Sequence, residues 1–426
     1  MAAYETVFSM DTSSIKFGPG ATREVGFEMK RLGAGRVLVV TDPNLSASQP
    51  VQTALEALKA EGIEAVLFDR ARVEPTDVSF KEAIDFASEG GFDGYVAVGG
   101  GSAMDTAKAA NLYATYPADF LTYVNPPIGQ GAPVPGPLKP MIAIPTTAGT
   151  GSETTGVAIF DYTELHAKTG IAHRALRPVM GIVDPENTRS MPPMVAACSG
   201  FDVLCHAIES LTAIPYNQRE APENPGMRPS YQGANPISDI WAAQSLKMMA
   251  QNIRRAVENP EDDEARSQML LAATYAGIGF GNAGCHLPHG MSYPVSGMVR
   301  DFRPEGYEVD HPIIPHGMSV ILNAPAVFRW TAQVNPERHL YAAELLGADV
   351  SDAKPEDAGE VLAGAIIDLM RAVGMPNGLA AVGFESDDIP ALVEGTLPQH
   401  RVTKLSPRPA GPDDLRELFA GAMRYW

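Results

Sequence analysis

The sequence contains few cysteines. Only Cys198, Cys205 and Cys285 are present among its 426 residues, and no two of them have CxxC spacing. An odd number of cysteines inside apolar segments argues against a disulfide framework and against a zinc-thiolate site. We therefore expect all three to be small core residues of a protein from a reducing compartment.

Positive charge and long hydrophobic runs are also scarce. The chain has 32 basic and 51 acidic residues, a net charge of -19. This balance argues against nucleic acid or an anionic membrane surface as a partner. No segment approaches the roughly 18 to 20 apolar residues of a membrane span. We expect small-molecule substrates, no nucleic-acid or membrane partner, and self-association into a homo-oligomer.

The first twenty residues do not resemble a targeting peptide. They lack a basic stretch followed by an apolar core, and they carry acidic residues that a mitochondrial transit peptide would avoid. We expect a cytoplasmic protein if the source is bacterial, and a mitochondrial matrix protein if the sequence is a trimmed eukaryotic form.

The length and the pattern of the chain predict two domains, because single cores seldom grow beyond about 250 to 300 residues. Residues 1–185 alternate short β-branched runs with helical patterns, which is typical of an α/β domain. Strands are predicted at 36–42, 64–69, 94–98, 140–145 and 181–185, with helices at 49–60 and 80–87. Residues 186–426 predict an all-helical domain, with helices at 192–211, 237–257, 262–284, 336–346, 355–373, 388–397 and 413–424.

A glycine turn follows the third predicted strand and opens a helix. Its residues are Gly99, Gly100, Gly101 and Ser102. Consecutive glycines let the backbone approach a pyrophosphate, and the amides of the following helix point towards it. The turn is not GxGxxG, and taken alone it is equally typical of a tight turn. Asp42, which ends the first predicted strand, is suited to bonding ribose hydroxyls. The loop at 146–155 is suited to the same nucleotide.

Asp202 and His206 stand four residues apart in an apolar helical pattern. This spacing places both side chains on one face, about one turn apart. Burying such a pair is costly unless something pairs with it, and a divalent metal is one such partner. The alternative is an Asp–His hydrogen bond inside a core.

Two further histidines favour the metal. His289 and His316 each belong to a PHGMS sequence, beside a proline and a glycine. Asp202 with three imidazoles would form a four-ligand site of nitrogen and oxygen atoms. Because no thiolate is included, Fe(II), Zn(II) and Mn(II) all fit it chemically.

With these motifs the chain resembles the group III iron-dependent alcohol dehydrogenases over essentially its whole length. The resemblance implies an N-terminal, Rossmann-like NAD-binding domain with a parallel sheet and an all-α metal-binding domain, the architecture also found in dehydroquinate synthase-like enzymes. It implies a divalent metal, Fe(II) first and Zn(II) as the alternative, held by Asp202, His206, His289 and His316. The implied NAD-binding residues are Asp42, Gly99, Gly100, Gly101, Ser102, Asp105, Thr146, Thr147, Lys168 and Val183.

One departure from the common family pattern is Tyr293. The alcohol dehydrogenases typically have a second histidine at this place, four residues after the third ligand. Together with GFDVLCHAIES and GTLPQHRVTKL, this is similar to the transhydrogenase branch of the family. That resemblance implies hydride transfer between a hydroxyacid and an oxoacid through bound NAD, with 4-hydroxybutyrate and 2-oxoglutarate as the substrates.

Other residues are candidates for proton transfer and substrate binding. Tyr293 and His286 are close in sequence to His289 and are candidate proton donors, although a structural role is the commoner one for such a histidine. The substrates are carboxylates, so a local concentration of cations is expected. Its candidates are Arg228, Arg401 and Lys404, although a solvated surface cation is the commoner role for any one of them.

Two other functional classes remain compatible with the sequence. One is an NAD-dependent iron-containing alcohol dehydrogenase that acts on a primary alcohol or aldehyde. The other is a non-redox lyase of the dehydroquinate synthase type, or an inactive binding protein. Steady NADH production from an alcohol without an oxoacid would identify the first class.

Overall fold

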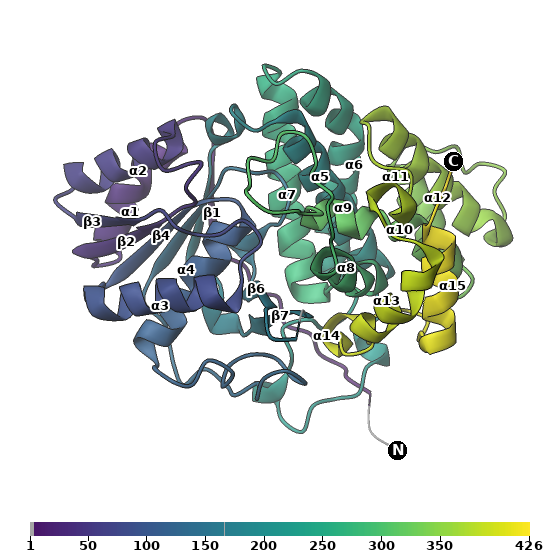
Figure 1. The fold of residues 1–426 in the computed structure, drawn as a ribbon, viewed down its shortest axis with the longest axis horizontal. Coiled ribbons are helices and arrows are strands. Elements are labelled where there is room, and N and C mark those ends of the chain that lie inside the picture. Colours follow the sequence, from purple (N-terminus) through teal and green to yellow (C-terminus); the bar gives the residue numbers. More distant parts are fainter. Residues whose placement is uncertain (1–3, 166) are drawn as a thin grey trace. The chain divides into compact units, whose positions relative to one another are not determined.

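The computed structural model describes residues 4–165 and 167–426, and these divide into two compact units. One unit comprises Thr12–Met191. The other comprises Met1–Asp11 together with Pro192–Trp426. Figure 1 shows a sheet with helices in the first unit and helices throughout the second, which confirms the predicted fold class.

The first unit is built on a parallel sheet of six strands, in the order β1-β8-β5-β4-β2-β3. These strands are β1 (Ser14–Phe17), β2 (Arg36–Val40), β3 (Glu64–Phe68), β4 (Gly94–Gly99), β5 (Met141–Pro145) and β8 (Met180–Val183). Two further strands, β6 (Val157–Tyr162) and β7 (Ala167–Ala172), form an antiparallel pair. The helices are α1 (Val25–Arg31), α2 (Gln49–Ala60), α3 (Asp77–Gly90) and α4 (Gly101–Thr115).

Both faces of the sheet are buried, which explains the uninterrupted apolar run of β2. Successive side chains of a strand point to opposite faces. Val37 and Val39 belong to a core cluster with residues of α1 and α2. Leu38 and Val40 belong to a cluster with residues of α3 and α4. A parallel sheet covered by helices on both faces requires such strands.

The second unit is helical among the residues that the structure describes. Its helices are α5 (Pro193–Thr212), α6 (Pro236–Glu258), α7 (Asp263–Ala283), α8 (Leu287–Gly297), α9 (His316–Ile321), α10 (Ala324–Thr331), α11 (Pro336–Leu345), α12 (Ala358–Ala372), α13 (Ile389–Thr396), α14 (His400–Thr403) and α15 (Pro412–Ala422). The central helix α5 packs against α6, α7 and α9. It is apolar enough to cross a membrane by composition, but 83% of its most apolar window is buried inside the protein, as in a core helix.

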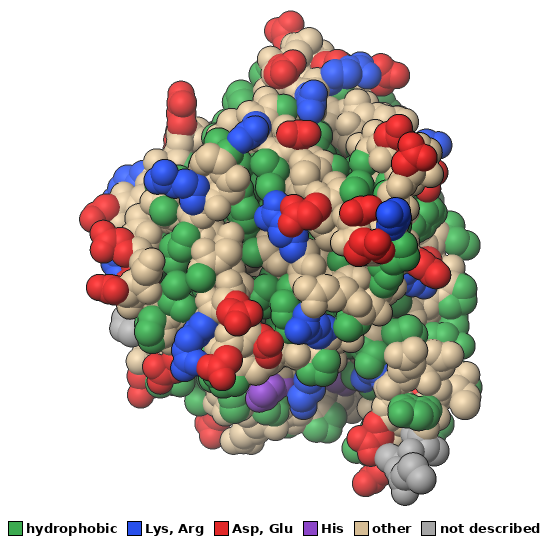
Figure 2. All heavy atoms as spheres, turned by 90° about the vertical axis from the view of Figure 1, so that its right-hand side faces the viewer, with side chains coloured by type: hydrophobic (Ala, Val, Ile, Leu, Met, Phe, Trp, Pro, Cys, Tyr) green, Lys and Arg blue, Asp and Glu red, His purple; other side chains and the backbone are tan. Residues whose placement is uncertain are grey.

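The surface seen in Figure 2 carries acidic and basic side chains interspersed among apolar ones. No basic patch gathers on this face. The three cysteines are buried and unpaired with one another, in agreement with the interpretation that they are core residues.

The units divide at positions that differ from the predicted boundary after residue 185. The first unit extends to Met191, and residues before Thr12 belong to the helical unit instead. The reason is a series of hydrogen bonds from the N-terminal segment to the helical unit. The Glu5 amide donates to the Arg219 carbonyl at 2.8 Å. The Ser9 and Asp11 amides donate to the side chains of Gln232 and Asn282, each at 2.9 Å.

Candidate functional site

Within the first unit, the candidate nucleotide-binding residues gather where the sheet changes direction. From β2 the chain proceeds outward to β3 on one side, and to β4, β5 and β8 on the other. The carboxyl ends of β2 and β4 therefore flank a topological switch point, which is where open α/β sheets bind their ligands. Asp42 follows β2 and Gly99 ends β4. A Cβ on Gly99 would lie 3.9 Å from the Asp42 carboxylate, so the structure brings these two residues together.

The glycine turn has no room for side chains. A Cβ on Gly99 would lie 2.7 Å from Ala103, and one on Gly101 would lie 2.7 Å from Thr150. Gly100 is the N-cap of α4 and offers no side chain to its amides. The first amides of α4 are therefore available to a ligand. Burial raises the pKa of Asp42, while the Asn44 and Leu45 amides stabilise its charged form.

The loop after β5 lies over the glycine turn. The Thr146 amide donates to the Gly99 carbonyl at 3.0 Å, and a Cβ on Gly100 would lie 3.3 Å from Thr147 Oγ1. Ser152 Oγ donates to Asp105 at 2.8 Å. Asp105 also accepts from the Ile159 amide, so its carboxylate holds the loop in place.

Two of the predicted cofactor residues are buried within the α/β unit and contribute to its structure. Lys168 is buried and lies 2.6 Å from Glu74 and 3.2 Å from Asp161 in ion pairs. Val183 ends β8 and is fully buried. A role for Lys168, Val183 or Asp105 in NAD binding stays a prediction.

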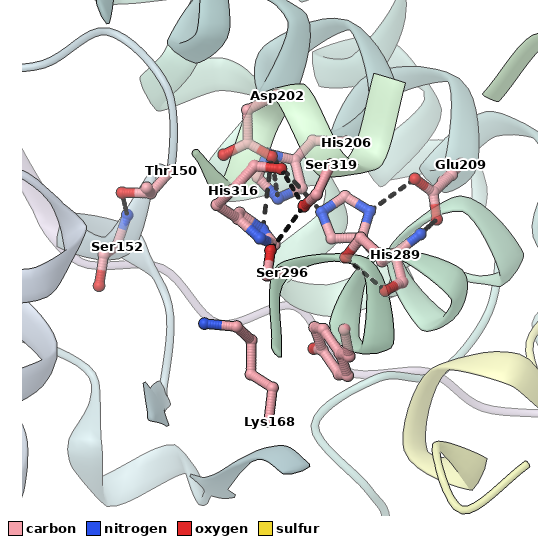
Figure 3. Close-up of polar contacts among 12 residues, drawn as sticks. Thr150, Ser152, Lys168, Asp202, His206, Glu209, His289, Ser296, His316 and Ser319 are labelled. Atoms are coloured by element: carbon pink, nitrogen blue, oxygen red, sulfur yellow. Dashed lines mark hydrogen bonds and ion pairs between the residues drawn. The ribbon is translucent and has the colours of Figure 1, made fainter. Parts of the chain in front are cut away.

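In the helical unit, the four predicted metal ligands come together around Asp202. Asp202 Oδ1 lies 3.6 Å from His206 Nε2, 3.5 Å from His289 Nε2 and 3.7 Å from His316 Nε2. Figure 3 shows the three imidazoles turned towards this carboxylate. The ligands come from three helices, with Asp202 and His206 one turn apart on α5, His289 on α8 and His316 at the start of α9.

The charge states of this cluster suit a divalent cation. Burial opposes the ionisation of Asp202, but the neighbouring imidazoles hold its pKa below the ordinary value. Burial lowers the pKa of His206 to about 3, so its imidazole is neutral. Within the described residues, Asp202 Oδ1 and His289 Nε2 are buried without a hydrogen-bond partner. A buried carboxylate and a neutral imidazole, with two further imidazoles beside them, fit a metal ion, whose binding would displace any proton from the ligand nitrogens.

Glu209 is a fully buried carboxylate that the sequence reasoning missed. His289 Nδ1 donates to Glu209 Oε1 at 2.6 Å, and the His286 amide donates to Oε2 at 2.6 Å. Because a carboxylate only accepts, His289 Nδ1 must carry a proton, so Nε2 is the ring nitrogen left for a metal. Glu209 therefore fixes the tautomer that a metal ligand requires. It lies one turn beyond His206 on α5, so helical spacing was an available signal.

The two PHGMS sequences form the same local structure. In each, the serine hydroxyl donates to the carbonyl of the histidine three residues before it, at 2.7 Å, for Ser292 to His289 and Ser319 to His316. The glycine of each permits close packing. A Cβ on Gly317 would lie 2.0 Å from the Cys198 carbonyl oxygen on α5. The repeat therefore begins two short helices, each with a predicted metal ligand in its first turn.

Cys285 also lies at this cluster. Its Sγ, His206 and His289 offer ligand atoms within 4.8 Å of one another. Burial raises the pKa of Cys285 to about 11, which keeps it a thiol and a poor ligand. The set with Asp202, His289 and His316 is the better match to a hard or borderline cation.

His286 and Tyr293, the candidate proton donors, are both buried. Thr212 Oγ1 donates to the Ile208 carbonyl and lies 2.9 Å from His286 Nε2, so Nε2 carries the proton. Burial lowers the pKa of His286 to about 4, and its imidazole is neutral. Tyr293 lies one turn after His289 on α8, and its phenol oxygen accepts from Arg401 Nη2 at 2.7 Å. A catalytic role for either residue stays a prediction.

The three candidate cations for substrate binding do not form one cluster of charges. Arg228 is paired with Glu5, at 3.0 Å from Nε to Oε2. Lys404 is exposed. Arg401 contacts Tyr293, and its guanidinium lies 5.2 Å from the centre of the Tyr231 ring.

Comparisons with known proteins agree with this geometry. Residues 12–185 match the family described as iron-containing alcohol dehydrogenase, and residues 230–423 match its C-terminal family. The "Hydroxyacid-oxoacid transhydrogenase, mitochondrial" of Rattus norvegicus is 58% identical over 421 residues, which are 98% of this chain and 90% of that protein.

Solved structures share the architecture. A 1,3-propanediol oxidoreductase superposes with a TM-score of 0.85 at 28% identity, over 98% of this chain and all of the other. A sulfoacetaldehyde reductase from Bifidobacterium kashiwanohense in complex with NAD+ superposes with a TM-score of 0.80 at 27% identity, over 98% of this chain and 99% of that one. The chain therefore belongs to the iron-containing alcohol dehydrogenase family and is an oxidoreductase that uses NAD and a metal.

Proposed function

We propose that this enzyme oxidises 4-hydroxybutyrate to succinate semialdehyde and reduces 2-oxoglutarate to D-2-hydroxyglutarate, with one bound NAD serving both steps. The first substrate gives a hydride to the nicotinamide and a proton to the protein or solvent. The second substrate takes both back, so no free NADH is consumed. The observation that carries the proposal is the buried cluster of Asp202, His206, His289 and His316. The identity to the transhydrogenase of Rattus norvegicus supports the choice of substrates.

Asp202, His206, His289 and His316 would hold the metal, and Fe(II) is proposed as the ion. Such a cation supplies Lewis acidity, which stabilises negative charge on the substrate oxygen. The chain's own residues prepare this site. Glu209 accepts the Nδ1 proton of His289 and so leaves Nε2 for the metal, and the burial of His206 keeps that imidazole neutral. In the glycine turn, the amides at the start of α4 and the carboxylate of Asp42 bind the nucleotide.

Deuterium transfer tests the transhydrogenase reaction. The enzyme is incubated with 4-hydroxybutyrate carrying two deuterium atoms at C4 and with unlabelled 2-oxoglutarate, without added nucleotide. We expect D-2-hydroxyglutarate with one deuterium at C2, detected by mass spectrometry, because the hydride passes through NAD without exchange with water. Turnover that requires stoichiometric added NADH would contradict the proposal.

A second incubation, with an alcohol and added NAD but no oxoacid, separates the alcohol dehydrogenase alternative. A plain dehydrogenase would accumulate NADH under these conditions. Tyr293 favours the transhydrogenase, because it stands where the alcohol dehydrogenases typically carry a histidine.

A further inference from the structure

Arg401 carries a half-buried positive charge that no carboxylate of the described residues compensates. It lies on α14, where Nη2 donates to the Tyr293 oxygen and the guanidinium faces the Tyr231 ring. Nη1 is buried, and no atom of the described residues accepts a hydrogen bond from it. No carboxylate of residues 4–165 or 167–426 forms an ion pair with Arg401 either. A guanidinium with a buried, unpartnered Nη1 and two tyrosines as its neighbours is costly unless an anion joins it.

This guanidinium is connected to the metal-ligand cluster by direct contacts. Tyr293 follows His289 by one turn of α8, about 6 Å along the helix axis. On the other side, the Tyr231 ring meets the edge of Phe280 at 6.4 Å between centres. Phe280 stacks on the His206 imidazole at 3.8 Å with an interplanar angle of 5°. Arg401 is thus connected to two predicted metal ligands, to His289 through Tyr293 and to His206 through Tyr231 and Phe280.

The backbone fixes Arg401 at this place. The segment that carries it crosses α8 at Gly290, directly after His289. A Cβ on Gly290 would lie 2.7 Å from Thr403 Cγ2 and 3.5 Å from Val402 Cγ2. Only a glycine lets α14 approach α8 so closely. The distance between Arg401 and His289 is therefore set by packing rather than by a flexible loop.

We propose that Arg401, with Tyr293 and Tyr231 beside it, is the receptor for the substrate carboxylate and determines the specificity for acids over alcohols. This inference rests on the proposed function. The planar guanidinium offers Nη1 to one carboxylate oxygen. Tyr293 accepts from Nη2, so its own O–H is available to a second oxygen. Tyr293 is then a positioning and binding group.

One receptor suffices for both half-reactions because the two substrates share a spacing. In 4-hydroxybutyrate the carboxyl carbon lies three bonds from the carbon that loses hydride. In 2-oxoglutarate the distal carboxyl carbon lies three bonds from the carbonyl carbon that accepts it. A carboxylate held at a fixed place by Arg401 therefore brings either reacting carbon to the same point. An acid shorter or longer by one methylene would not satisfy both contacts.

The test compares a charged substrate with its neutral counterpart. For Arg401→Gln, we expect kcat/KM for 4-hydroxybutyrate to fall about 100-fold, through KM, because a charge-assisted hydrogen bond to a buried group is lost. Arg401→Lys should recover part of this loss. For 4-hydroxybutyramide, which lacks the negative charge, kcat/KM should change less than about threefold. A preference for the acid that is unchanged in Arg401→Gln would overturn the inference.

Arg408→Gln is the matched control. Arg408 also lies over an aromatic ring, 4.0 Å from the centre of Trp330, and donates to Gln333 at 2.7 Å. Its replacement removes the same charge from the same C-terminal region, and the preference for the acid should persist. An equal loss in both variants would mean that general electrostatics is responsible, which would also overturn the inference.

A binding measurement separates this inference from the proposed function. Butyrate has the carboxylate but no hydroxyl, so it cannot react. We expect it to raise the thermal midpoint of the metal-loaded wild-type enzyme but not that of Arg401→Gln. If the wild type fails the deuterium experiment but still shows this dependence on Arg401, the proposed function falls and the receptor stands. If deuterium is transferred and butyrate stabilises both proteins equally, the receptor falls.

Discussion

Glu209 shows how one buried carboxylate prepares a histidine for a metal. Burial opposes its ionisation, but His289 and the His286 amide together lower the pKa of Glu209 below the ordinary value. The negative charge remains inside the protein because it accepts hydrogen bonds from both residues. Its contribution is to orient the imidazole of His289 and to make Nε2 more basic.

Glu209→Gln should lower the affinity for the metal about 10- to 100-fold. The amide has the same shape, but it lacks the charge and can present an N–H to His289 Nδ1. Titration with a competing chelator measures the affinity. Glu28→Gln is the control, because Glu28 is also buried and ion-paired, with Lys16 and Arg31, but belongs to the other unit. Equal affinity in Glu209→Gln and the wild type would contradict this role.

At the level of single residues, the sequence predicted the cluster of Asp202 and three histidines but not Glu209, which orients one of these histidines. The spacing of Asp202 and His206, and the repeated PHGMS, were visible as patterns. Glu209 lies on the same helical face, and a search for a third polar position on that face would have found it. The contact of Arg401 with Tyr231 had no such signal, because the two residues are far apart in the chain and meet only through folding.

Close approach between helices positions His316. The first turn of α9 lies against α5 at Gly317, where a Cβ would meet the Cys198 carbonyl oxygen at 2.0 Å and its carbon at 2.8 Å. Both are backbone atoms, which cannot rotate away. Any side chain at 317 must displace the whole of α9, together with the histidine that begins it.

Gly317→Ala should therefore weaken metal binding and cost roughly 1 to 3 kcal/mol in the free energy of unfolding. Urea denaturation and metal analysis of the purified protein measure the two effects. Gly364→Ala is the control, since Gly364 lies within α12 and a methyl group added there would meet no atom within 4 Å. It should leave metal content unchanged and stabilise the protein by up to about 1 kcal/mol. Normal metal content in Gly317→Ala would contradict the steric argument.

The long helices and the buried strands could be predicted, whereas several short elements could not. The prediction for α2 was correct at both ends, because its apolar periodicity is regular. The strand β1 was missed because its four residues are mostly accessible and carry no apolar run. The helices α8 and α9 were not predicted, because proline and glycine surround their histidines. There the glycines serve packing between helices rather than chain reversal.

At the scale of the whole molecule, the predicted metal ligands and the predicted nucleotide-binding residues belong to different units. Removal of the metal with a chelator should speed hydrogen exchange about 100-fold in α5, α8 and α9, which corresponds to an ion present at about 100 times its dissociation constant. NAD should slow exchange in the β4–α4 turn and at residues 146–151. Mass spectrometry of peptides resolves both changes. A uniform change in exchange along the chain would contradict the assignment of metal and nucleotide to different units.

Fe(II) or Zn(II), added back separately, should restore protection, and the activity regained with each identifies the ion that supports catalysis.

The two-domain architecture followed from composition and periodicity, but the path of the chain between the units did not. Nothing in residues 4–11 distinguishes them from the segment that follows, and their hydrogen bonds to Arg219, Gln232 and Asn282 depend on tertiary structure. The predicted boundary therefore follows a change in pattern that begins several residues before Met191, the last residue of the first unit.

The course of the N-terminal segment makes the α/β unit an insertion. Residues 4–11 belong to the helical unit, and the chain then enters the α/β unit at Thr12 and returns at Pro192. Its first strand, β1, pairs directly with its last, β8, so the points of entry and exit are neighbours. Such an arrangement allows one contiguous stretch of sequence to be excised or exchanged between relatives. The metal-binding unit, by contrast, is discontinuous in sequence: an expressed fragment that starts at Pro192 would lack the segment that pairs with Arg219, Gln232 and Asn282.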